Sequence, residues 1–225
     1  MQHSLQPESK TIVESETEVP IDYFKDKLCL IFSPDISTIQ MIEAMGCDHL
    51  SYLPNMREML DEYLLAADFV LLTGGTDISP AIYGQSKGDY TDTADSDRDV
   101  LESMVIRKCI KLGVTVIGIC RGSQLLSSVL GGRLIQHDIN HFHSHNIMLE
   151  NGKMLLNCNA NHHQLIIPPS TSRILGTCPD TGVNEIIFHP AVGLSVQYHP
   201  EWHEPHDLPF KYFVRLVHDS LEDIL

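Results

Sequence analysis

Short, continuous apolar runs alternate with amphipathic segments over residues 28–130. The runs are typical of strands that are buried on both faces, and apolar residues at i, i+3 and i+4 are typical of helices. The predicted strands are 28–32, 49–53, 69–72 and 114–119, and the predicted helices are 36–45, 56–66, 100–112 and 124–130. This alternation predicts an α/β fold in which helices flank a mostly parallel sheet.

The pattern changes after residue 133, where short strands and turns replace the alternation. The predicted strands are 146–149, 154–156, 174–177, 185–188 and 194–198, and a last helix is predicted at 210–221. We expect these additional strands to be antiparallel. The sequence contains no internal repeat and no dividing linker. We therefore expect an N-terminal tail or edge extension over 1–27 and one domain over 28–225.

Charge and composition exclude several classes of function. The 225 residues include 30 acidic and 15 basic side chains, which gives a formal net charge of -15. Such a surface repels nucleic-acid phosphates and anionic membranes, so we expect neither as a partner. No apolar run is long enough to cross a bilayer, and the first residues lack the pattern of a signal peptide. We therefore expect a cytoplasmic protein with reduced cysteines.

One cysteine has a context that suggests chemistry. The sequence GICRG at 118–122 places Cys120 where the strand 114–119 meets the following helix. A nucleophile on such a tight turn is exposed above the sheet, and the flanking glycines permit a strained backbone. The N-terminal end of the helix favours a thiolate. This pentapeptide alone fits a buried structural cysteine equally well.

His199 is the candidate base for this thiol, and it directly follows the predicted strand 194–198. Its position predicts that His199 lies at the same edge of the sheet as Cys120. Residues two apart in an extended segment point the same way, so Glu201 can reach the far ring nitrogen and fix the tautomer. A surface histidine near an acid is the alternative for any single histidine. Together, the three residues predict a catalytic triad.

The segment TGGTD at 73–77 follows another apolar strand. Acyl transfer needs N–H donors that hold a tetrahedral oxyanion, and a glycine lets the backbone approach the substrate closely. The backbone amides of Gly75 and Arg121 are therefore the candidates for an oxyanion hole.

The strings LLTGGTDISPAIYG, GICRGSQ, GGRLIQH, CNANHHQ and VQYHPEW occur in this order over roughly residues 68–220. This arrangement resembles the class I glutamine amidotransferases, and more narrowly their γ-glutamyl-γ-aminobutyrate hydrolase branch. The resemblance implies a flavodoxin-like core, with Cys120, His199 and Glu201 as the triad. It also implies that Gln124 faces a glutamyl group, and that His162 or His163 lines the substrate pocket. Residues 1–27 match nothing in the family pattern, and the histidine-rich string HDINHFHSH departs from it.

The 13 histidines also suggest a metal site. His141, His143 and His145 alternate, and His203 and His206 flank Glu204. Spacing of i, i+2 on a loop is weak evidence, because zinc ligands are usually fixed on defined elements and supported by carboxylates. The predicted catalysis needs no metal, so we expect no metal and no cofactor.

Three functions are compatible with this sequence. The first is a self-contained hydrolase that cleaves a γ-glutamyl amide through a thioester on Cys120. The second is a glutaminase that delivers ammonia to a separate synthetase, or a variant that transfers the glutamyl group to an amine. The third is a non-catalytic binding subunit, against which the intact triad argues. The expected partners are a γ-glutamyl amide or glutamine, and a second copy of the chain or a synthetase.

Overall fold

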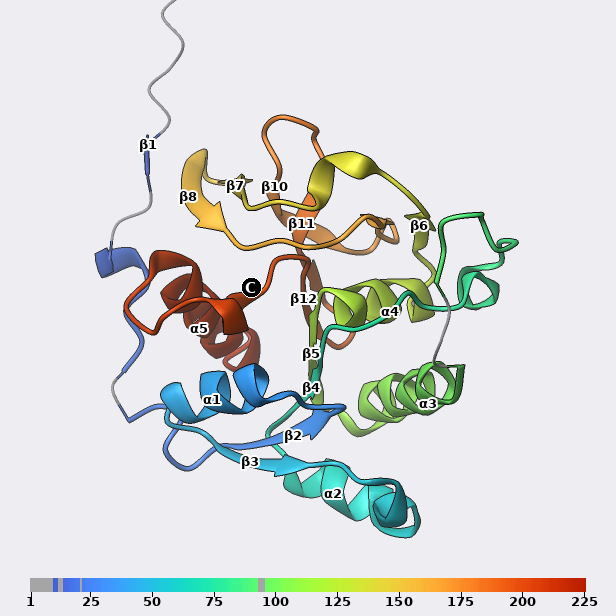
Figure 1. Ribbon diagram of the computed structural model, residues 1–225. Coiled ribbons are helices and arrows are strands. Elements are labelled where there is room, and N and C mark those ends of the chain that lie inside the picture. The colour runs from blue at the N-terminus through green and yellow to red at the C-terminus, as the bar shows by residue number, and fades with distance from the viewer. Residues whose placement is uncertain (1–9, 12–13, 21, 93–95) are drawn as a thin grey trace, which may run out of the picture.

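The computed structural model describes residues 10–11, 14–20, 22–92 and 96–225. Within these residues, twelve strands join in one mixed sheet (Figure 1). The strands are β1 (Lys10–Thr11), β2 (Leu28–Phe32), β3 (Asp48–Ser51), β4 (Phe69–Leu72), β5 (Thr115–Ile119), β6 (Arg133–Ile135), β7 (His145–Leu149), β8 (Lys153–Cys158), β9 (Leu165–Ile167), β10 (Arg173–Thr177), β11 (Asn184–His189) and β12 (Gly193–Val196). The α-helices are α1 (Ile36–Ala44), α2 (Leu60–Ala66), α3 (Ser96–Leu112), α4 (Arg121–Val129) and α5 (Leu208–Leu221). The 3-10 helices are η1 (Glu14–Glu16), η2 (Pro54–Met59), η3 (Pro80–Tyr83), η4 (Ile139–His141) and η5 (Pro200–Trp202).

The centre of the sheet is parallel, in the order β3-β2-β4-β5-β12. Ile117 of β5 pairs with Leu71 of β4 on one side and with Leu194 of β12 on the other. The carboxyl ends of β4, β5 and β12 therefore meet at one edge, where ligands bind in open α/β sheets. The predicted α/β fold class is confirmed.

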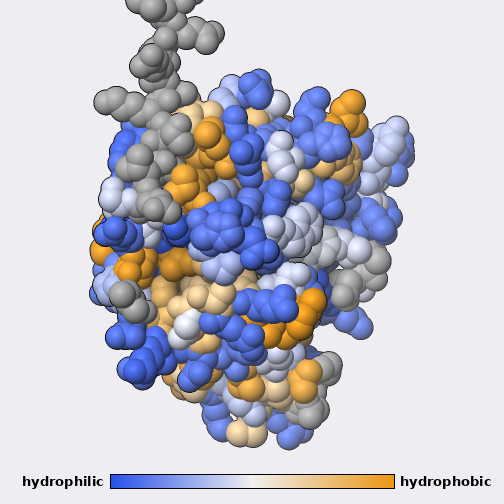
Figure 2. All heavy atoms as spheres, turned by 60° about the vertical axis from the view of Figure 1, so that its left-hand side comes forward, coloured by the Kyte–Doolittle hydropathy of each residue, from blue (hydrophilic) through white to orange (hydrophobic). Residues whose placement is uncertain are grey.

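Helices cover both faces of this parallel part (Figure 1). On one face, α1 and α5 pack against a buried apolar cluster that includes Met41, Phe213 and Ile117. On the other face, α2, α3 and α4 pack against a second cluster that includes Leu64 and Ile106. Because both faces are covered, strands such as β2 and β4 are apolar along their whole length. On the surface of the molecule, hydrophilic residues dominate the side that carries α1 and α5, and hydrophobic residues lie there in small groups (Figure 2).

An antiparallel extension continues the sheet beyond β12, through β11, β10, β7 and β8. Two further strands, β6 and β9, pair with each other, and β9 also pairs with β11. The pattern of the sequence did not predict β6 and β9, because each has only three residues. The loops after η4 and before β9 form one wall of the site described below.

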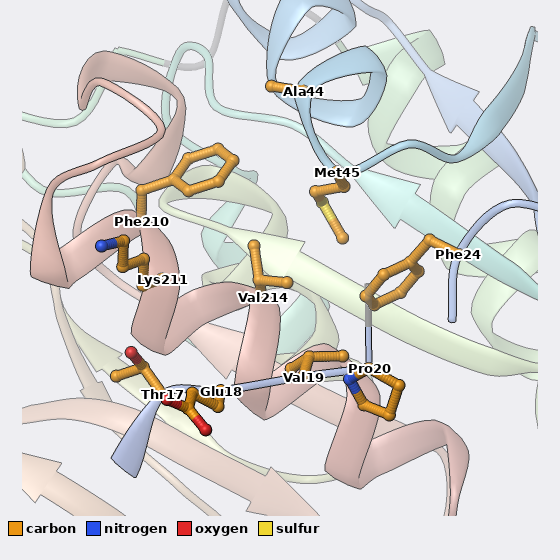
Figure 3. Close-up of a pocket in the computed structure, with 10 residues that line it drawn as sticks. All are labelled: Thr17, Glu18, Val19, Pro20, Phe24, Ala44, Met45, Phe210, Lys211 and Val214. Atoms are coloured by element: carbon orange, nitrogen blue, oxygen red, sulfur yellow. The ribbon is translucent and has the colours of Figure 1, made fainter. Parts of the chain in front are cut away.

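The N-terminal segment lies against α5. Phe24 is buried, and Val19 and Tyr23 pack against the same apolar cluster as α5. A cavity of about 310 Å³ lies between this segment, α5 and the end of α1, and Figure 3 shows the side chains that line it. Upstream, β1 pairs in parallel with β8. The division of the chain at residue 27 stays a prediction.

Several helices begin at residues other than those predicted; α4, for example, starts at Arg121 rather than residue 124. Helix α3 starts at Ser96 rather than residue 100. The sequence pattern did not predict the first turn, because this turn is polar and shows no apolar period. Asp97 and Asp99 nevertheless suit the positive end of the helix dipole. The segment predicted as the helix 56–66 is divided into η2 and α2. None of the helices in the described ranges is long and apolar enough to cross a membrane.

Candidate functional site

Cys120 lies on the turn between β5 and α4 and is the N-cap of that helix, with φ 48° and ψ -106°. A positive φ is uncommon for a residue with a side chain, and such strain concentrates at functional sites. A Cβ added at Gly122 would lie 2.2 Å from the Leu72 carbonyl oxygen, and one at Gly118 would lie 2.7 Å from the Gly122 backbone. Both glycines are therefore required by the close packing of this turn on itself and on β4.

His199 lies just after β12 and faces the same turn. Its Nδ1 is 2.6 Å from Glu201 Oε1, and the two side chains are only 6% and 3% exposed. Burial acts to lower the pKa of His199, but hydrogen bonding and charge from Cys120 and Glu201 outweigh it and raise the pKa to about 10. An imidazolium beside a cysteine stabilises the thiolate.

Gly74 follows β4 and lies against both Cys120 and His199. A Cβ added there would lie 3.1 Å from His199 Cε1 and 3.9 Å from Cys120 Cβ. In a separate contact, the Trp202 ring stacks on the His199 ring, with 3.7 Å between the centroids and an angle of 4° between the planes. An aromatic face against an imidazolium is favourable, so Trp202 holds the plane of the ring.

A buried ion-pair network fixes the loop that carries Gly74 and Gly75. Arg98 donates hydrogen bonds to the Thr73 and Gly74 carbonyl oxygens, each at 3.0 Å. Glu102 accepts from Arg98 Nε at 2.7 Å and from the Arg121 guanidinium at 2.5 Å. Arg121 also pairs with Asp99, with 2.5 Å between the charged groups. The network therefore joins the loop after β4 to the residue that follows Cys120.

A cavity of about 250 Å³ opens beside Cys120. This volume lies just below the range of about 300–1,000 Å³ that is typical of ligand pockets, so it suits a small ligand. Its lining includes the predicted residues Gly75, Gln124, His162 and His163, together with Thr76, Asp77, Asp92, Phe142 and Asn161. His163 is held by Asp77, with 3.1 Å between Nε2 and the nearest carboxylate oxygens. The structure thus brings every sequence-predicted site residue to one edge of the sheet.

Sequence reasoning missed Arg98, Glu102 and Trp202. The i, i+4 spacing of Arg98 and Glu102 was a signal for one helical face, but only Glu102 fell inside the predicted helix 100–112. Trp202 stands next to the proposed triad acid in the string QYHPEW, and an aromatic residue there was a signal for a stacking partner.

Comparison with known proteins gives one family match. Residues 36–201 match the peptidase C26 family. The chain is 30% identical to the glutamine amidotransferase-like protein YvdE of Lactococcus lactis, over 76% of this chain and 82% of that protein. It is 29% identical to the gamma-glutamyl-gamma-aminobutyrate hydrolase of Escherichia coli (strain K12), over 64% of this chain and 68% of the relative.

Among solved structures, a glutamine amidotransferase from Thermotoga maritima has a similar fold. The TM-score is 0.60 at 17% identity, and the alignment covers 88% of this chain and 84% of that one. The resemblance to the class I glutamine amidotransferases that the sequence indicated is confirmed.

Proposed function

Since the chain belongs to the peptidase C26 family, we propose that it is a cysteine-dependent hydrolase of a γ-glutamyl amide. The observation that carries this proposal is the 2.6 Å contact between His199 and Glu201, beside a strained Cys120 on the turn before α4. A buried acid that orients a histidine next to a nucleophile is the arrangement that acyl transfer requires.

In the first half of the reaction, the Cys120 thiolate attacks the γ-carbonyl carbon. The amides of Gly75 and Arg121 hold the oxyanion that forms. His199 gives its proton to the leaving amine as the C–N bond breaks, and the glutamyl group stays on Cys120 as a thioester. Glu201 stabilises the imidazolium throughout.

In the second half, water replaces the amine. Neutral His199 takes a proton from water as the oxygen attacks the thioester, and the C–S bond breaks to release glutamate. The cavity wall made by Gln124, His162 and His163 holds the glutamyl group in this proposal.

The name of the Escherichia coli relative favours a γ-glutamyl amide as substrate and water as acceptor. The names of other relatives favour a glutamine amidotransferase. In that alternative, a separate synthetase would receive the ammonia. Both functions share every step up to the thioester. They differ in the amine that leaves and in the need for a partner.

The test is release of glutamate from a panel of γ-glutamyl amides that includes glutamine, without any other protein. Cys120→Ala is the blank. Cys109→Ala is the matched control, because it makes the same change at a buried residue of α3. We expect turnover by wild type and Cys109→Ala only, and a thioester adduct that mass spectrometry detects after an acid quench.

Each result separates the candidates. Turnover of a γ-glutamyl amine well above glutamine supports the hydrolase. Slow turnover of glutamine alone supports the synthetase-dependent glutaminase. Equal glutamate from wild type and Cys120→Ala, with every substrate, contradicts the self-contained hydrolase and supports a binding subunit.

A further inference from the structure

A second cluster of titratable side chains lies next to the cavity and shares His162 with its lining. It consists of His141 at the end of η4, His145 at the start of β7, His162 before β9, and Glu185 in β11. One ligand atom from each residue lies within 4.8 Å of the corresponding atom of every other. Only His162 also lines the cavity. The proposed reaction uses none of the other three residues.

The three distances from Glu185 to the histidines are close to those between ligands of one metal ion. Glu185 Oε1 lies 3.5 Å from His141 Nδ1, 3.1 Å from His145 Nε2 and 3.6 Å from His162 Nε2. A tetrahedral zinc ion with bonds of about 2.0–2.1 Å separates its ligands by about 3.3 Å. The three distances lie on both sides of this value.

The atoms that face one another are buried and have no hydrogen-bond partner among the described residues. They are His141 Nδ1, His145 Nε2, His162 Nε2 and both carboxylate oxygens of Glu185. The Glu185 side chain is 0% exposed, and those of His141 and His162 are each 1% exposed. A carboxylate in such a place is costly unless a cation compensates it.

The outer ring nitrogens have oxygen partners. His145 Nδ1 lies 3.1 Å from the His143 carbonyl, and His162 Nδ1 lies 3.1 Å from the Gln164 carbonyl. A carbonyl oxygen only accepts, so these nitrogens carry protons, and in the neutral rings the inward nitrogens present lone pairs. For His162 this contact is shorter than that to the Gln197 amide nitrogen, at 3.3 Å.

His141 completes the pattern, because its Nε2 lies 3.0 Å from Thr181 Oγ1. Metal-binding histidines nearly always donate their second N–H to an oxygen acceptor, which fixes the tautomer and orients the ring. Three inward lone pairs and a carboxylate around one point repel one another unless a cation lies between them.

We propose that His141, His145, His162 and Glu185 bind one zinc ion. Imidazole nitrogens with one carboxylate suit Zn²⁺, whereas Ca²⁺ and Mg²⁺ prefer oxygen ligands throughout. Four protein ligands complete a tetrahedron and leave no open position, so the ion is structural. It ties together η4, β7, β11 and the segment that presents His162 to the cavity.

The spacing of histidines along the loop did not predict this site. His162 and Glu185 are far from His141 in sequence. The pairing of β9 with β11 brings His162 near Glu185, and a backbone hydrogen bond from His162 to the His141 carbonyl brings His141 to the same place. His143, the middle member of the alternating set, supplies a backbone carbonyl to His145 instead of a ligand.

The test uses the full-length protein and does not depend on its activity. Metal content is measured by mass spectrometry after dialysis, and the chelator-treated protein is then titrated with ZnCl₂ while its melting temperature is followed. We expect about one zinc ion per chain and a rise in melting temperature that saturates at one equivalent. Co²⁺ in place of zinc should give the visible absorption bands of a tetrahedral site with nitrogen and oxygen ligands.

His145→Ala and Glu185→Gln each remove one ligand, and His206→Ala removes an exposed histidine as the matched control. We expect the first two to weaken zinc binding by more than the roughly 10–100-fold that loss of an outer partner costs. His206→Ala should bind as wild type does. If the ligand variants do not fold, the wild-type titration and the cobalt spectrum still test whether the cluster binds zinc.

Two results would overturn the proposal. One is a wild-type protein whose melting temperature does not respond to chelator or to zinc and which gives no tetrahedral cobalt spectrum; a shared proton then replaces the cation in the cluster. The other is equal zinc affinity in wild type and His145→Ala, which places the ion elsewhere on the surface. Both results leave the cysteine-dependent hydrolysis to be judged by its own assay.

Discussion

The ion pairs of Glu102 offer the sharpest test of how the site is held together. The Glu102 side chain is 0% exposed and contacts Arg98 and Arg121, whose side chains are 12% and 1% exposed. Replacing Glu102 with Gln keeps the volume of the side chain but removes its charge. The amide N–H groups of the new side chain then face guanidinium groups that are themselves donors, so one contact becomes repulsive.

The expected loss of stability follows from the burial of the Glu102 ion pairs. Removing one partner of a buried ion pair costs about 3–5 kcal/mol, because the remaining charge is left uncompensated. At roughly 2–4 °C per kcal/mol for a chain of this size, the melting temperature should fall by about 6–20 °C. Arg121 keeps Asp99, which places the loss toward the lower end of the range.

The matched control is Asp61→Asn, which makes the same acid-to-amide change in an exposed pair with Lys108. Its side chain is 62% exposed, and pairs of this kind contribute about 0–1 kcal/mol. Urea denaturation followed by circular dichroism gives the free energy of unfolding of each variant. A loss for Glu102→Gln no greater than that for Asp61→Asn would refute the reasoning that the network anchors the loop after β4.

Three more changes test other parts of the site. Glu201→Gln should lower kcat by about 10²–10⁴-fold with little change in KM, because the imidazolium loses its stabilising charge; steady-state kinetics would contradict this if kcat stayed within twofold. The pKa of His199, about 10 in the folded protein, lies above its ordinary value of 6.5, so its contribution to stability is full below pH 6.5 and is lost as the pH rises through about 10. The difference in melting temperature between wild type and His199→Gln should therefore shrink over that interval, and a constant difference would count against the raised pKa. Gly122→Ala should cost at least about 3 kcal/mol, since its Cβ would lie 2.2 Å from a backbone oxygen of Leu72; Gly88→Ala meets only a flexible side chain at 3.0 Å and should cost far less in the same urea assay.

The sequence predicted the parallel centre of the fold well. Strands such as β4 and β5 are continuous apolar runs that end in turn residues, so local pattern and final structure agree. The resemblance and the strand ends together indicated that Cys120, His199 and Glu201 would lie close to one another. Their catalytic roles stay predictions.

What the sequence could not supply depends on contacts between distant segments. The start of α3 is polar, and the side chains of Arg98 and Asp99 become buried only because α3 packs beside the loop after β4 and the start of α4. The cluster around Glu185 forms only when β7, β9 and β11 have found their registers. Neither arrangement leaves a period in the local sequence.

The order of strands in the sheet also determines when the site can form during synthesis. Strand β12 is made long after β5, yet it occupies the position beside β5 at the centre of the sheet. Until β12 is made, β5 has an unpaired edge whose backbone groups can pair with a strand of another chain. Cys120 meanwhile lacks His199, so an unfinished chain carries the thiol without its proposed base. Insertion of one late strand thus closes the vulnerable edge and assembles the site in the same event.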